Sequence, residues 1–123
     1  MAKELTAAGR LLFDDGDTRV EFNKGVLTID STGKQVVHHI QSIGTSEPGE
    51  ALDVGDITTL GWIIFFNRDK TNYVEIRPGS GLADLLRIEK REVSGPMRLA
   101  QDATLYAIAN TAACELEYLL IED

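Results

Sequence analysis

Residues 60–77 constrain the fold more than any other part of the sequence. They contain five consecutive apolar residues, Trp62 to Phe66, whose aromatic and β-branched side chains favour a β-strand. A strand that is apolar on both faces is typical of a central strand covered on both sides. We therefore expect residues 62–66 to be buried in the core.

A polar segment follows this run and predicts a turn at residues 67–72. Strict alternation of apolar and polar residues begins after it, which is the pattern of a half-buried strand. Residues 60–77 thus predict a β-hairpin. In its second strand the inward residues are Val74 and Ile76, and the outward residues are Tyr73, Glu75 and Arg77.

A second hairpin is predicted upstream, with strands at residues 18–23 and 26–31 and a turn at Lys24-Gly25. An acidic turn at residues 14–17 separates it from the apolar residues 11–13. The side chains expected on its inner face are Val20, Phe22, Leu27 and Ile29.

Further turn signals punctuate the rest of the chain. Thr32-Gly33 precedes a strand predicted at residues 34–43, and residues 45–50 form a polar stretch expected to be an extended loop. Short strands spaced by roughly ten residues are typical of a sandwich or barrel. The fold class expected is therefore all-β, an antiparallel β-sandwich in a single domain over residues 1–123.

The carboxyl-terminal segment, residues 104–121, allows two interpretations. A helical stripe in an alanine-rich context fits it, and so do two strands at residues 104–109 and 113–121 with a break at Asn110-Thr111. In the strand interpretation one face of the last strand carries Cys114, Leu116, Tyr118 and Leu120.

Composition and charge exclude several classes of function. Of 123 residues, 20 are acidic and 12 basic, giving a formal net charge of -8, which repels nucleic acid and anionic membranes. The single cysteine, Cys114, forms no intramolecular disulfide. The start of the sequence lacks the apolar run of a signal peptide, so we expect a soluble protein made in the cytoplasm.

Several segments resemble small structural proteins of tailed bacteriophages. The resemblance rests on Ile43-Gly44-Thr45-Ser46-Glu47, Leu60-Gly61-Trp62, Asn67-Arg68-Asp69-Lys70-Thr71-Asn72-Tyr73-Val74-Glu75 and the ending from Ala112 to Asp123. It implies a jelly-roll-like sandwich that assembles with copies of itself on a capsid or tail, without catalytic residues or cofactor. The resemblance also favours strands over a helix in residues 104–121.

Candidate metal ligands are few. Asp14, Asp15 and Asp17 cluster carboxylates on one turn, but the spacing lacks the bidentate glutamate of an EF-hand, and aspartates in turns usually accept bonds from their own backbone. His38 and His39 are adjacent in a predicted strand, so they point to opposite faces and do not share a metal within one chain. We expect no metal requirement.

The other candidates also have ordinary structural interpretations. Cys114 lies on an apolar strand face, and Gly79-Ser80-Gly81 lacks the lysine of a phosphate-binding loop. Trp62 and Tyr73 could form a platform for stacking on a sugar, but Trp62 opens the most hydrophobic run of the chain, so we expect it in the core or an interface. Residues 89–92 mix both charge signs, as a solvated turn does. No catalytic triad or dinucleotide motif is present, so we expect no enzymatic activity.

The function expected is therefore that of a virion structural protein, a capsid decoration or cement protein made in the host cytoplasm and located in the virion. Its partners would be copies of itself, as a trimer, and the major capsid or other virion proteins. Leu119 and Ile121 are the expected interface residues, because they lie opposite the apolar face of the last strand. The alternatives are a neck or tail component, or a carbohydrate-binding module for host recognition.

Overall fold

The computed structural model describes residues 5–29 and 35–123, which form ten β-strands and no helix. The predicted all-β, antiparallel class is confirmed. By its contacts the chain divides into two compact units, Met1–Thr32 and Gly33–Asp123. Both sheets of the sandwich are built from strands of the second unit, and the expected single domain over residues 1–123 stays a prediction.

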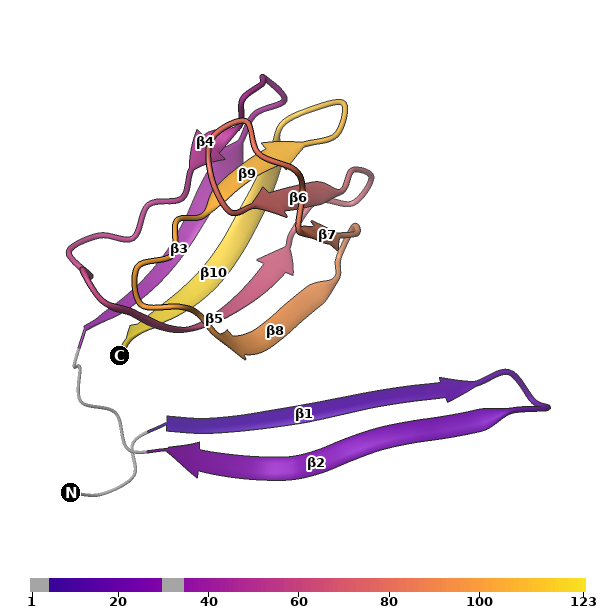
Figure 1. Ribbon diagram of the computed structural model, residues 1–123. Coiled ribbons are helices and arrows are strands. Elements are labelled where there is room, and N and C mark those ends of the chain that lie inside the picture. Colours follow the sequence, from indigo (N-terminus) through magenta and orange to yellow (C-terminus); the bar gives the residue numbers. More distant parts are fainter. Residues whose placement is uncertain (1–4, 30–34) are drawn as a thin grey trace. The chain divides into compact units, whose positions relative to one another are not determined.

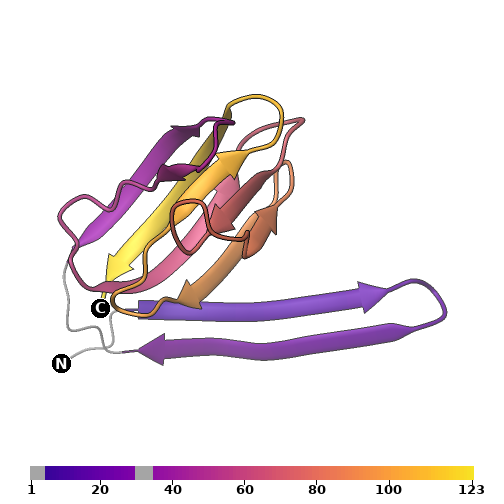
Figure 2. The same ribbon diagram turned by 45° about the horizontal axis from the view of Figure 1, so that its top comes forward.

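The second unit is a sandwich of two four-stranded antiparallel sheets, which lie as two layers in Figures 1 and 2. The first sheet has the order β3-β10-β5-β8 and the second the order β4-β9-β6-β7. Successive strands mostly alternate between the sheets, so that eight strands in two layers give the jelly-roll-like architecture expected. The strands are β3 (Val36–Ile43), β4 (Glu50–Ala51), β5 (Leu60–Asn67), β6 (Val74–Arg77), β7 (Leu86–Ile88), β8 (Val93–Arg98), β9 (Tyr106–Ala109) and β10 (Cys114–Glu122).

The core lies between the two sheets. Alternate residues of the central strands β5 and β10 are buried, as the period of a strand requires. Phe65 and Tyr118 are the largest of the fully buried side chains, and their ring centroids are 6.4 Å apart. The Tyr118 hydroxyl donates to the carbonyl oxygen of Asp53 at 2.7 Å, which satisfies a buried polar group.

The hairpin predicted over residues 60–77 is wrong. β5 pairs with β10 and β8, whereas β6 pairs with β9 and β7, so the two strands belong to different sheets. The polar residues between them form a corner that crosses from one sheet to the other. A hairpin and such a corner have the same local pattern, because both need turn residues between alternating strands.

Buried Asn67 holds this corner. Its amide nitrogen donates to the carbonyl oxygens of Asn72 and Ile88, at 2.9 and 3.0 Å. Asp69 accepts backbone N–H groups of Thr71 and Asn72, and these bonds lower the pKa of its carboxyl group.

Burial along β5 and β6 alternates from residue to residue, so the prediction that all of residues 62–66 are buried is wrong. Val74 and Ile76 point inward as predicted. Arg77 shares the outward face of β6 with Glu75, as predicted, but it is buried there, bound to Glu47 and Asp84. In β5 only Ile63 and Phe65 of residues 62–66 are fully buried. The other three, Trp62, Ile64 and Phe66, are half-buried and lie on the outer face of the sheet.

The strand interpretation of the carboxyl-terminal segment is confirmed. β9 and β10 replace the alternative helix, with a turn at residues 110–113. The predicted inner face of the last strand is correct, because Cys114, Leu116, Tyr118 and Leu120 are all buried.

The first unit is a long antiparallel hairpin of β1 (Leu5–Asp14) and β2 (Arg19–Ile29), labelled in Figure 1. The acidic turn lies where the sequence predicted it. The turn predicted at Lys24-Gly25 is wrong, because β2 continues through it with a β-bulge. Gly25 has a φ of 69°, the left-handed backbone that a bulge and a tight turn both require. The glycine therefore marked a left-handed position correctly, but that position belongs to a bulge and not to a turn.

Phe65→Ala should destabilise the sandwich by about 3–5 kcal/mol, because it opens a cavity between the two sheets beside Tyr118. Chemical denaturation followed by tryptophan fluorescence measures the free energy of unfolding. Phe66→Ala is the matched control, since the same side chain is half-buried on the outer face and should cost much less. Equal losses for the two variants would contradict this assignment of the faces.

Candidate interaction surfaces

One face of the hairpin is apolar along its whole described length. Residues directly opposite each other in an antiparallel pair share a face, and so do residues two apart in a strand. The pairs Leu11↔Phe22 and Phe13↔Val20 therefore lie on one face, and Ala7↔Leu27 lies on the same face nearer the chain's start. We call this the apolar hairpin face, formed by Leu5, Ala7, Leu11, Phe13, Val20, Phe22 and Leu27.

The bulge is what makes this face continuous. Val20 and Phe22 have even numbers and Leu27 an odd one, so an unbroken strand would place them on opposite faces. The register shifts by one residue at Gly9/Arg10, where Lys24 is the extra residue of β2. Counting past this residue returns Leu27 to the face of Phe22. The prediction that Val20, Phe22 and Leu27 share one face is thus correct, but the prediction that this face points inward is wrong, because all three side chains are more than half exposed. Ile29, also predicted inward, has its side chain outside the described part.

The large side chains of the apolar hairpin face are not covered. Leu11, Phe13, Val20, Phe22 and Leu27 are each 56% to 75% exposed. A sheet of two strands has no second layer to bury such a face, and isolated hairpins of this kind are marginally stable in water. This face therefore has the properties of a surface that a partner covers.

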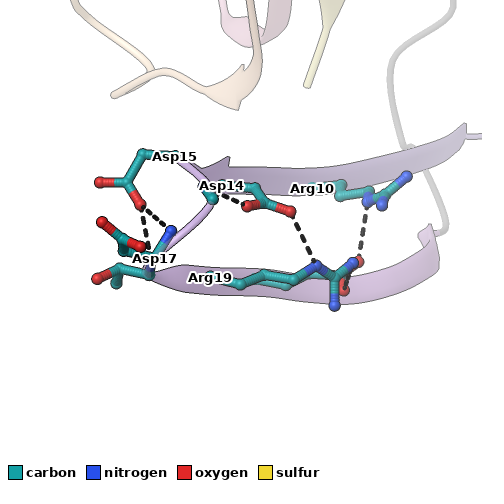
Figure 3. A network of polar contacts seen from close by, with 8 residues as sticks. Arg10, Asp14, Asp15, Asp17 and Arg19 are labelled. Carbon is teal, nitrogen blue, oxygen red and sulfur yellow. Dashed lines mark hydrogen bonds and ion pairs between the residues drawn. The ribbon is translucent and has the colours of Figure 1, made fainter.

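The opposite hairpin face is polar in its outer half. Arg10 binds Glu21 across the strands at 2.9 Å, and Arg19 approaches both Asp14 and Glu21, as Figure 3 shows for the ion pairs of this region. Leu12 is an apolar residue of this face and is directly opposite Glu21. The hairpin is thus amphipathic, with ion pairs on one side and apolar side chains on the other.

Of the candidate metal ligands Asp14, Asp15 and Asp17, the first two accept hydrogen bonds from the backbone of the turn itself. Asp14 accepts the N–H of Gly16, and Asp15 accepts the N–H groups of Asp17 and Thr18 (Figure 3). The bonds from Thr18 and Asp17 lower the pKa of the Asp15 carboxyl. These contacts are those of an aspartate turn, and the described residues contain no group of three or more His, Cys, Asp or Glu arranged to hold a metal ion.

The outer face of the sheet β3-β10-β5-β8 is a second apolar surface. Three rows of side chains cross it, and their centres are the pairs Ile121↔Trp62, Leu119↔Ile64 and Glu117↔Phe66. β3 and β8 extend these rows with further apolar residues at the edges. We call this the apolar sheet face, formed by Val36, Ile40, Trp62, Ile64, Phe66, Val93, Leu119 and Ile121.

One polar contact interrupts the apolar sheet face. His38 Nε2 in β3 lies 2.7 Å from a carboxylate oxygen of Glu117 in the neighbouring strand β10. Beside it lies a shallow hollow of about 240 Å³, lined in part by Ile64, Val93 and Leu119. The outer face of the other sheet differs, because Glu75 and Arg87 pair there and the Arg87 guanidinium stacks 3.8 Å from the Tyr73 ring.

The predicted interface residues Leu119 and Ile121 both lie on the apolar sheet face, half-buried and directed away from the core. Their role in an interface stays a prediction. The sequence analysis did not identify their neighbours Trp62, Ile64 and Phe66 as interface residues. The signal for them was that β5 is apolar on both of its faces. The sequence did not indicate the hairpin face as a surface, because alternating apolar residues are equally typical of a core strand.

The other sequence candidates are dispersed. Trp62 pairs with Ile121 at one end of β10, while the Tyr73 carbonyl contacts Cys114 at the other end, so the two rings do not form a joint platform. Guanidinium groups of Arg98 and Arg87 lie over these two rings. His39 points away from His38, as predicted, and its ring packs on Tyr118.

Two predicted connections are confirmed as turns. Gly79-Ser80-Gly81 lies between β6 and β7, and the N–H of Gly81 donates to the carbonyl of Pro48. Residues 89–92 join β7 to β8, and Glu92 bonds back to Glu89.

Arg77 is the most buried charged group in the described part of the chain, and it makes four hydrogen bonds. Its guanidinium binds both carboxylate oxygens of Glu47, at 2.7 and 2.8 Å, together with Asp84 and the carbonyl of Pro48. The ion pair lowers the pKa of the Glu47 carboxyl. This arrangement ties two loops to β6.

Among the described residues no helix could cross a membrane.

Cys114 should react slowly with thiol reagents in the native protein. It is buried at the start of β10, and burial raises the pKa of its thiol to about 11, so the reactive thiolate is scarce at neutral pH. Labelling with a chromogenic disulfide before and after denaturation measures the difference. Labelling at the same rate in both states would show that the inner face of β10 is accessible.

The surfaces are not matched by a known relative. A scan against protein-family models, a search of curated proteins and a search of solved structures each find no match to this chain. The two apolar faces therefore define the candidate site by their geometry alone.

Proposed function

We propose that this chain is a non-enzymatic assembly protein that joins a larger structure by burying its apolar hairpin face against neighbouring subunits. The observation that carries the proposal is the alignment of Leu11, Phe13, Val20, Phe22 and Leu27 on one uncovered face of a two-stranded sheet. The β-bulge adds one residue, Lys24, to β2, and this insertion keeps the apolar side chains on one face.

The physical gain on assembly is large for so small an element. Burying one leucine side chain contributes roughly 1.5–3 kcal/mol. Several such side chains on one hairpin favour a partner that supplies the missing second layer. The ion pairs of the opposite face, such as Arg10–Glu21, can stay in water while this happens.

The setting we propose is the virion of a tailed phage, where the chain decorates or cements the capsid. The sequence resemblance supports this setting, and so does the jelly-roll-like architecture, which is common among viral capsid proteins although fold alone does not fix function. Repetition over a lattice would turn modest contacts of one subunit into strong avidity. The net charge of -8 would limit association away from the lattice.

Purified protein should bind tailed-phage particles that assembled without it. Cosedimentation with separated heads and tails measures this, and binding to tails alone would favour the neck or tail position. Leu11→Lys should weaken binding at least tenfold, because about 1.4 kcal/mol corresponds to a factor of ten. Leu12→Lys is the matched control, since the neighbouring leucine lies on the polar face opposite Glu21.

Two results would contradict the proposal. If the wild-type chain binds neither heads nor tails, the virion setting is wrong. If Leu11→Lys and Leu12→Lys bind as tightly as the wild-type chain, the hairpin face takes no part in assembly.

A further inference from the structure

We propose that the apolar hairpin face of one copy packs on the apolar sheet face of a second copy, so that the chain assembles with itself head to tail. This inference rests on the proposed function, since both use the hairpin as the assembly element. It adds the identity of the partner and the surface that receives the hairpin.

The two surfaces are complementary in form. Each is one side of an antiparallel sheet, and stacked sheets pack about 10 Å apart through interdigitating apolar side chains. The hairpin is two strands wide, which matches the two central strands of the apolar sheet face, β10 and β5. Leu119 and Ile64, paired at the middle of that face, would lie beneath the hairpin.

Their charges are complementary as well. The Lys24 ammonium lies 5.0 Å from the ring centroid of Phe22, and the sheet face carries Glu117, which lies in the row of Phe66 and hydrogen-bonds to His38. The tip of the hairpin, residues 14–17, is acidic, whereas Arg91 and Arg98 lie over Phe66 and Trp62 of the sheet face. Opposite charges are thus available on both surfaces around an apolar centre.

Length excludes complete cover of the hairpin by the sheet face of the same chain. The hairpin face extends over nine residues of β1, from Leu5 to Phe13, or about 26 Å at 3.3 Å per residue. The apolar rows of the sheet face extend over five residues of β5, from Trp62 to Phe66, or about 13 Å. One sheet face therefore covers about half of the hairpin, whichever molecule provides it, and the remainder requires another molecule.

The contact joins two different surfaces, so it is heterologous. Such contacts generate a ring if the rotation between copies closes and an open filament if it does not. In a closed ring, the sheet face of every copy is covered, together with about half of each hairpin face.

Light scattering tests the assembly. The wild-type chain should be an oligomer at micromolar concentration, and Leu11→Lys in the hairpin or Ile64→Lys in the sheet should each weaken self-association at least tenfold. Leu12→Lys and Glu75→Lys, on the polar hairpin face and the outer face of the other sheet, should leave it unchanged. Thermal melting of each variant verifies that the sandwich is folded.

Cross-linking between different molecules tests the partner. In a Cys114→Ala background that melts like the parent, one protein carries Phe22→Cys and another carries Ile64→Cys. Mixing them with a short bismaleimide should give a covalent heterodimer, and replacing the first protein with Leu12→Cys should give at most a tenth of that yield.

The outcomes separate this inference from the proposed function. A monomeric wild-type chain with no heterodimer overturns the inference, and binding of that monomer to phage particles through Leu11 would leave the proposed function intact. Cross-linking found only within single molecules of a double variant also overturns it. An oligomer with the expected heterodimer that binds no particle would support the inference and refute the virion setting.

Discussion

The packing of Phe65 and Tyr118 between the two sheets is the interaction on which the sandwich depends. Both side chains come from central strands of the same sheet, and both are almost fully buried against the other layer. Tyr118 also bonds to the Asp53 carbonyl, so that one side chain fixes β10 to the segment that follows β4. Burial raises the pKa of this hydroxyl to about 12, which keeps it neutral and able to donate.

Once the inner faces are fixed in this way, the outer faces follow from the period of a strand. Ile63 and Phe65 point inward, so Trp62, Ile64 and Phe66 must point outward together. The same holds for Leu119 and Ile121 beside Leu120. The position of the apolar sheet face is thus set by the core, whereas the period of a strand does not require its side chains to be apolar.

Local pattern predicted most strands and the inner face of β10, because burial and alternation are properties of short segments. It did not predict which strands pair. Residues 67–72 satisfy the rules for a hairpin turn and for a corner between sheets, and only pairing of β5 with β10 decides between them. The Lys24-Gly25 signal failed in a similar way, since a bulge and a turn both use glycine with positive φ.

The apolar sheet face was predictable in part. Leu119 and Ile121 were identified from one strand, but their neighbours in β5 lie beside them only because of the register in which β5 and β10 pair.

The β-bulge of the hairpin limits how its sequence can vary. Its apolar face depends on the number of residues between Phe22 and Leu27 more than on the identity of Lys24, which is the extra residue. Substitution at this position would therefore be tolerated in evolution, whereas deletion of one residue would divide the apolar side chains between two faces.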